Sequence, residues 1–179
     1  MNNLDLIDWP WVVFSALWLT GLAVLLATCG FADYLAAQLK GFRSHSRSDP
    51  HAVAYMWGMA SQLSDPIIKA IAAHYSAKRA AAGVQGDAKL TARGKVIFQQ
   101  GVLDQGIPAC ATCHGEQAQG NGAFPRLAGQ HAPYLLKQML VIQNALRVAP
   151  VMHGVIKQLT RDQMLAVASY LESIGPSVQ

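Results

Sequence analysis

The chain has 179 residues, of which 52% are hydrophobic and 13% are charged, and its formal net charge is +4. This length suits one domain with attachments or two small domains. We find no nucleic-acid-binding module and no long basic run, so nucleic acid is excluded as a partner. The mild positive charge is compatible with docking on acidic proteins or on anionic lipid.

The chain begins with an apolar segment over residues 1–30. Residues 9–32 contain no charged side chain, and a run of ~20 apolar residues is long enough to cross a bilayer. Two aspartates precede the run, where a secretory signal would have basic residues. The sequence therefore predicts membrane contact through residues 9–32, as an anchor in the inner membrane.

Three interpretations of residues 1–30 stay open. The segment is a membrane anchor, or it ends in a lipidated Cys29 because Leu26-Ala27-Thr28-Cys29 loosely resembles a lipobox, or it stems from a wrong start or a frameshift. The acidic start and the abrupt change of pattern at Phe31 favour a reading-frame error. The basic residues after the segment favour it too, because the positive-inside rule would place the rest of the chain in the cytoplasm.

Helical patterns dominate the rest of the chain. Residues 31–82 have a helical pattern, and residues 83–92 are typical of a linker. A helix is predicted to begin at residues 91–98 and to end by Gly101, and a loop rich in Gly, Pro and Asn follows over residues 106–129. The predicted apolar side of the helix consists of Val96, Ile97 and Phe98.

Two further helices are predicted toward the end of the chain. Residues 133–147 carry apolar side chains at helical spacing after an initial proline, and residues 148–154 are predicted to be a loop. The last helix begins at Thr160, which forms a capping box with Gln163, and ends before Gly175. The sequence therefore predicts an all-α fold.

One motif carries the chemistry: Cys110-Ala111-Thr112-Cys113-His114. Two thiols three residues apart can each bond one vinyl group of the same porphyrin, and the next residue presents its imidazole to the iron. A zinc site would need another Cys or His pair, and a thioredoxin-like pair expects a βαβ setting. We therefore predict a covalently attached c-type haem with His114 as an iron ligand.

A six-coordinate haem needs a second axial ligand. Methionine suits an electron carrier because its thioether favours ferrous iron. Met139 and Met164 occupy helix positions where an apolar side chain would face the core. Met152 follows a proline in a predicted loop, so it is the favoured ligand, with His153 as its competitor.

The sequence repeats itself. Residues 33–39 resemble residues 133–139, Met56-Trp57-Gly58 resembles Met152-His153-Gly154, and Gln62-Leu63-Ser64 resembles Gln158-Leu159-Thr160. We therefore predict three parts: the apolar segment 1–30, a partial repeat over residues 31–82 without a haem motif, and a complete copy over residues 84–179.

The complete copy resembles class I cytochrome c, and in particular the dihaem cytochrome c4 type and its close single-haem relatives. The resemblance implies a class I cytochrome c fold around one covalent haem, preceded by a helical half-repeat and the apolar segment. The matching residues are Gly94 to Phe98, Cys110 to His114, Gly120 to Gly122, Pro125 to Gln130, Tyr134, Leu135, Gln138, Met152 and Tyr170.

The resemblance also implies roles for single residues. The carbonyl of Pro125 would accept from the His114 ring nitrogen that faces away from the iron. Gly94 and Phe98 would pack against the last helix near Tyr170. Arg126 and Tyr134 would contact the haem propionates or the pocket wall.

The function implied is one-electron transfer, not enzymatic turnover. Members of this family reside in the periplasm, free or membrane-bound, and exchange electrons with terminal oxidases, dehydrogenases or other cytochromes. This chain departs from the dihaem pattern because Met56 has no attachment motif before it, so one haem is expected and Met56 is interpreted as an apolar residue. The alternative is a haem c enzyme subunit or gas sensor with an open sixth coordination position.

Overall fold

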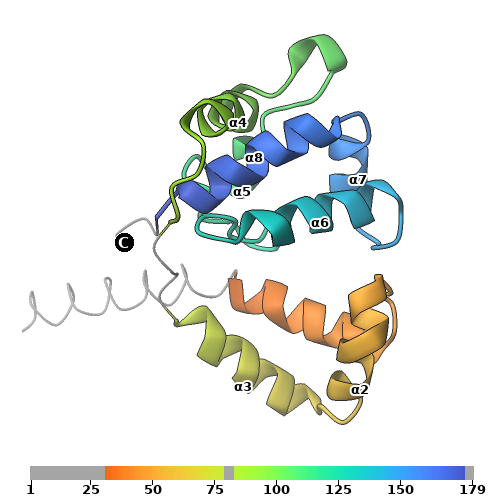
Figure 1. Ribbon diagram of the computed structural model, residues 1–179. Helices are drawn as coiled ribbons and strands as arrows, with labels where there is room; N and C mark the ends of the chain where they lie inside the picture. Colours follow the sequence, from red (N-terminus) through yellow and green to blue (C-terminus); the bar gives the residue numbers. More distant parts are fainter. Residues whose placement is uncertain (1–30, 79–82, 176–179) are drawn as a thin grey trace, which may run out of the picture.

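The structure, a computed structural model, describes residues 31–78 and 83–175 (Figure 1). Within these residues all regular elements are helices, and the only β pairings are two isolated bridges. The expected all-α fold is therefore confirmed. No helix among the described residues is long and apolar enough to span a bilayer. The apolar segment 1–30 lies outside the described residues, so its interpretation stays a prediction.

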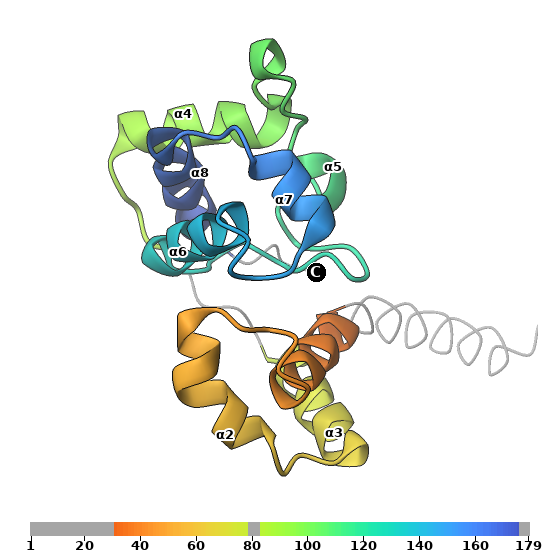
Figure 2. The same ribbon diagram turned by 90° about the vertical axis from the view of Figure 1, so that its right-hand side faces the viewer.

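The helices form two groups, which lie one above the other in two perpendicular views (Figures 1 and 2). The first group (residues 31–78) contains a helix over residues 31–43, then η1 (Ala52–Met56), α2 (Trp57–Ala60) and α3 (Asp65–Ser76). The second group (residues 83–175) contains α4 (Ala88–Gln100), η2 (Leu103–Gln105), α5 (Ala111–His114), α6 (Ala132–Gln143), α7 (Pro150–Ile156) and α8 (Arg161–Ser173).

The contact between α4 and α8 is the closest in the second group. A Cβ atom on Gly94 would lie 1.9 Å from the carbonyl oxygen of Ala166, so only glycine permits this approach. Phe98 is fully buried, and its ring centroid lies 5.6 Å from that of Tyr170. The expected packing of Gly94 and Phe98 near Tyr170 is confirmed. Val96 is 51% exposed, so its predicted place on the apolar side is wrong.

Two helix starts depend on capping side chains. The Asp87 carboxylate accepts from the backbone N–H of Leu90 at 2.7 Å. This cap starts α4 at residue 88, so residues 88–92 are helical and their assignment to a linker is wrong. The Thr160–Gln163 capping box before α8 is present in both directions, as predicted.

The region after α6 differs from the prediction. The helix ends at Gln143, not at residue 147, and Ala145 has a left-handed backbone with φ of 56°. Residues 150–156 form the short helix α7 where a loop was expected. Its first residue is Pro150, whose fixed φ suits the first helical position and whose missing N–H is not needed there. Met152 therefore lies on a helix.

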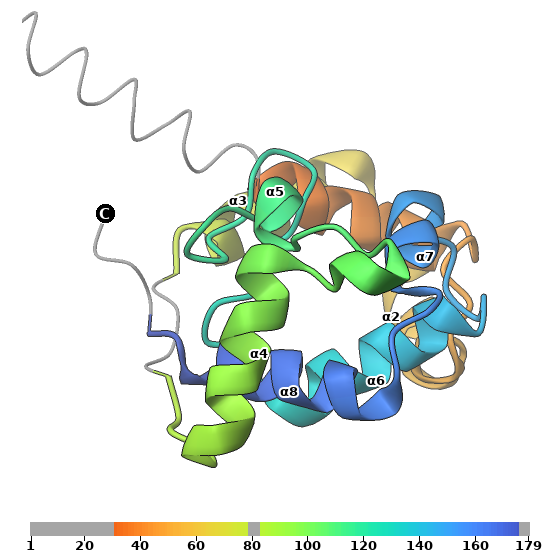
Figure 3. The same cartoon turned by 90° about the horizontal axis from the view of Figure 1, so that it is seen from above.

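The core of the second group lies between α4, α6, α7 and α8, which form a ring when viewed from above (Figure 3). Met139 is 7% exposed and Met164 is fully buried, so both belong to this core as the sequence indicated. The other buried residues of this apolar cluster are Ile97, Phe98, Ile107, Ala118, Ala128, Leu135, Ile142, Ile156, Leu159, Ala166, Val167, Ala168 and Leu171.

Candidate functional site

Cys113 and His114 lie on the single helical turn α5, and Cys110 is the N-cap residue directly before it. The backbone N–H groups of Cys113 and His114 both donate to the carbonyl of Cys110, at 3.3 and 3.0 Å. This turn holds the three side chains in a fixed order around one axis. The spacing that suggested a shared ligand is therefore realised in one rigid element.

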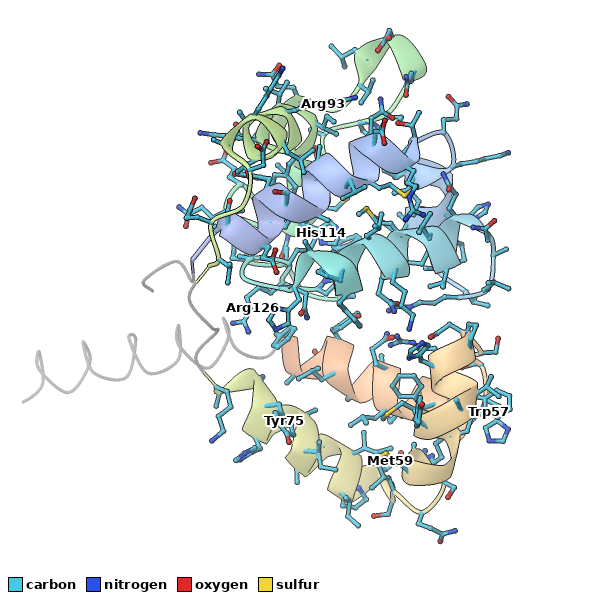
Figure 4. All side chains as sticks on the ribbon, in the orientation of Figure 1. Trp57, Met59, Tyr75, Arg93, His114 and Arg126 are labelled. Carbon is cyan, nitrogen blue, oxygen red and sulfur yellow. The ribbon has the colours of Figure 1, made fainter. Side chains whose placement is uncertain are left out.

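His114 points into the second group and is 7% exposed (Figure 4). Its Nδ1 lies 2.9 Å from the carbonyl oxygen of Pro125. Because a carbonyl oxygen only accepts, Nδ1 carries the proton and the lone pair of Nε2 stays free. Burial lowers the pKa of His114, against the opposing effect of the Pro125 hydrogen bond. The side chain is thus a neutral imidazole with one nitrogen available to a metal.

The loop around Gly120 brings Pro125 to His114. The backbone N–H of Gly120 donates to the His114 carbonyl at 2.9 Å, and its φ of 87° turns the chain back. A Cβ atom there would lie 2.7 Å from the backbone nitrogen of Arg126. The loop therefore depends on a residue without a side chain.

The cysteines do not have the properties of a redox pair. Burial raises the pKa of Cys110 to about 11, so this thiol is protonated at neutral pH. A thioredoxin-like cysteine has a lowered pKa. Among the described residues there is also no group of three or more His, Cys, Asp or Glu side chains that could hold a metal ion. The raised pKa of Cys110 thus disfavours the redox-pair interpretation.

Met152 is half-buried and packs on the same apolar core as Cys110. A glutamine that the sequence did not single out fixes the end of its helix. The Nε2 of Gln143 lies within 3.2 Å of the carbonyl oxygens of Ile156, Lys157 and Leu159. These contacts hold the C-terminal end of α7 against α6.

His153, the competing ligand, contacts α6. Its Nδ1 lies 2.9 Å from the carbonyl oxygen of Ile142. This hydrogen bond fixes the ring beside α6 and ties α7 to α6. Like the contact of His114, it leaves the Nε2 of the ring without a proton, and Met152 as the iron ligand stays a prediction.

Arg126 and Tyr134 lie toward the first group. The Arg126 guanidinium is 5.0 Å from the centre of the Phe31 ring, and burial lowers its pKa. Tyr134 is 42% exposed. It lines a cavity of about 510 Å³ together with first-group residues that include Tyr34 and Gln38. Their contact with a cofactor stays a prediction.

The residues present fit a covalently bound haem. Two thiols close together on one turn can attach a porphyrin, and a neutral imidazole with an unprotonated nitrogen and a thioether packed on the same core can ligate its iron. The apolar core around them would give the bound iron a low-dielectric surrounding, which favours its less charged ferrous form. Cys110, Cys113 and His114 would hold the haem, and Met152 would supply the second axial ligand of its iron.

Comparison with known proteins agrees with this chemistry. The sequence pattern of the family "Cytochrome c" matches residues 91–175. Cytochrome c-552 of Acidithiobacillus ferridurans is 42% identical over 143 residues, which cover 79% of this chain and 62% of that protein. The Acidithiobacillus ferrooxidans cytochrome c4 structure has a TM-score of 0.76 at 40% identity, covering 82% of this chain and 87% of that one.

A third similar protein is named for its partner. The thiosulfate dehydrogenase electron acceptor of Thiomonas intermedia is 35% identical over 145 residues, which cover 78% of this chain and 65% of that protein. The chain thus spans slightly less than two thirds of both curated relatives named here.

Proposed function

The chain belongs to the cytochrome c family, with cytochromes c4 among its relatives, and we propose that it carries one electron at a time on one haem ligated by His114 and Met152. Its relatives are electron-transfer proteins, and it is an electron carrier of the haem c type rather than an enzyme. When bound, the haem supplies reversible one-electron chemistry at its iron.

One observation carries the proposal: the His114 Nδ1 lies 2.9 Å from the Pro125 carbonyl oxygen. This contact fixes the tautomer and the ring orientation, so Nε2 is presented to the iron without a further proton loss. Cys110 and Cys113 bind the porphyrin on the same turn. The apolar core excludes water, which limits reorganisation when the charge changes.

The proposal of a single haem rests on the two repeats. The second group has the attachment motif, whereas the first group has the methionine equivalent, Met56, without any Cys-x-x-Cys-His before it. Met56 is half-buried and packs on a small core of Phe42, Ala52 and Ala60. This packing accounts for Met56 without a haem.

We propose that the protein acts in the periplasm and passes electrons between a dehydrogenase and a terminal oxidase or another cytochrome. Covalent haem attachment outside the inner membrane supports this place. The similar electron acceptor of a thiosulfate dehydrogenase supports a dehydrogenase as the donor. Membrane attachment through residues 9–32 belongs to the same proposal and rests on their hydropathy.

Substitution of Met152 tests the ligation. Met152→Ala should convert a six-coordinate low-spin spectrum into a high-spin one and open the ferrous iron to carbon monoxide. The matched control is Met56→Ala, the equivalent residue of the first repeat, which should leave the spectrum unchanged. An unchanged spectrum for Met152→Ala would exclude Met152 as the ligand, and carbon monoxide binding by the wild type would favour the sensor or enzyme alternative.

A further inference from the structure

The helix that bears Met152 is tethered unevenly. Gln143 holds the C-terminal end of α7, and His153 holds its middle. The chain that leads into its N-terminal end, residues 144–149, has little apolar packing, because Leu146 is 48% exposed and Val148 is 73% exposed. The position of this entry segment therefore depends on polar contacts.

The longest-reaching of these contacts comes from Arg147. Its Nη1 donates to Gln138 Oε1 at 2.5 Å, within the second group. Its Nη2 donates to Gln38 Oε1 at 2.8 Å and to the Tyr34 hydroxyl at 3.0 Å, both in the first group. The guanidinium of Arg147 thus joins the segment before α7 to the helix over residues 31–43 in the first group.

The first group contains an equivalent arginine, Arg47. Arg47 donates to Gln38 Oε1 at 2.8 Å and to Gln138 Oε1 at 3.3 Å. Its Nε also donates to Asp49, which is 1% exposed, at 2.9 Å. Each glutamine oxygen therefore accepts from both arginines, and each arginine follows the glutamine of its own repeat by the same number of residues.

This network is well suited to hold a defined geometry. A guanidinium is planar and carries its donors in a fixed fork, so several simultaneous hydrogen bonds restrict both its distance and its orientation. The Arg47–Asp49 pair is largely shielded from solvent, which reduces screening. The first group thereby holds Gln38 at a fixed position, where it accepts from Arg147.

We infer that Arg147 is a positioning residue for Met152. Anchored on the first group, it holds the segment that enters α7 and so keeps the thioether at the haem iron. The half-repeat, which has no haem motif of its own, thereby stabilises the haem ligation of the other repeat. This inference rests on the proposed His/Met ligation.

Imidazole binding to the ferric, full-length, haem-loaded protein tests the inference, because imidazole must displace the methionine. Arg147→Leu loses the charge-assisted hydrogen bonds that hold the segment before α7, so Met152 should be displaced more easily. This variant should therefore bind imidazole about tenfold more tightly than the wild type. Arg147→Lys should fall between the two, because an ammonium keeps the charge without the fork. The matched control is Arg93→Leu, an exposed arginine on α4 far from the network (Figure 4).

Gln38→Leu provides the decisive second variant, because it changes only the first group. It should tighten imidazole binding about threefold. In the double variant with Arg147→Leu, the fold-change should be smaller than the product of the two single fold-changes, since both substitutions remove the same Arg147–Gln38 hydrogen bond. It also keeps the test informative should Arg147→Leu fail to fold.

The outcomes separate the two proposals. If wild type and Met152→Ala bind imidazole equally, the His/Met ligation fails, and the inference fails with it. If Met152→Ala binds imidazole more tightly than wild type but Gln38→Leu and Arg147→Lys match Arg93→Leu, the ligation stands and the role of Arg147 is refuted. Tighter binding in Arg147→Lys and Gln38→Leu, with Arg93→Leu at the wild-type value, supports it.

Discussion

Helices α3 and α8 occupy equivalent places in the two repeats but differ in burial. Along α8, Ala166 is fully buried, whereas Ala70, its α3 counterpart by the alignment of Gln62 with Gln158, is exposed. The reason is α4, which packs closely on α8 through Gly94. No described helix covers α3 in this way. Similar helix sequences therefore reach different burial because one has a partner on its second face.

Loss of the haem motif should have the largest effect, and this effect should be confined to the second group. In the Cys110→Ala/Cys113→Ala double variant we expect complete loss of covalent haem and loss of helical structure in the second group, since its apolar core would lose the cofactor that it is proposed to hold. Haem staining of the denatured protein and circular dichroism measure the two effects. Cys29→Ala is the control and should keep its haem; staining of the double variant at the control level would contradict the prediction.

Loss of the α4–α8 contact should have the next largest effect. Phe98 is fully buried, so Phe98→Ala should lower the free energy of unfolding of the second group by about 4 kcal/mol. Val96 lies on the same helix and is 51% exposed, and Val96→Ala should cost less than about 0.5 kcal/mol. Urea unfolding followed at the haem band gives both values, and equal costs would show that α4 does not pack as described.

A matched pair of alanine-to-leucine substitutions tests the difference in burial between α3 and α8. Ala166→Leu places a large side chain where α4 approaches most closely and should cost about 3 kcal/mol. Ala70→Leu adds the same volume on the exposed face of α3 and should change the free energy of unfolding by less than about 0.5 kcal/mol. Urea titration of both variants is the measurement, and a large cost for Ala70→Leu would reveal a partner on that face of α3.

The smallest expected effect is a pH dependence confined to the first group. The hydrogen bond from Arg43, at 2.6 Å, and the charge of Lys40 lower the pKa of Asp65 below its usual 3.8. The unfolded chain therefore binds this proton first, so the contribution to stability is full above pH 3.8 and is lost as pH falls through the lowered pKa. Urea unfolding of wild type and Asp65→Asn at a series of acidic pH values tests this; parallel curves would refute it.

Several features followed from local sequence alone. The capping box at Thr160 and Gln163 depends on residues three apart, and the haem motif depends on five consecutive residues. The core positions of Met139 and Met164 follow from helical periodicity. Short-range hydrogen bonds and side-chain spacing determine these features, so they do not require knowledge of the fold.

Other features needed contacts between distant parts of the chain. Sequence pattern misplaced Val96 and predicted a loop at α7, because the burial of a short segment depends on which helices surround it. The bonds from Arg147 to Gln38 and Tyr34 join residues more than a hundred positions apart. The sequence by itself thus determined the haem chemistry and the helical repeats. The tertiary structure decided which surfaces are buried and which arginines join the two repeats, since both depend on side chains that only folding brings together.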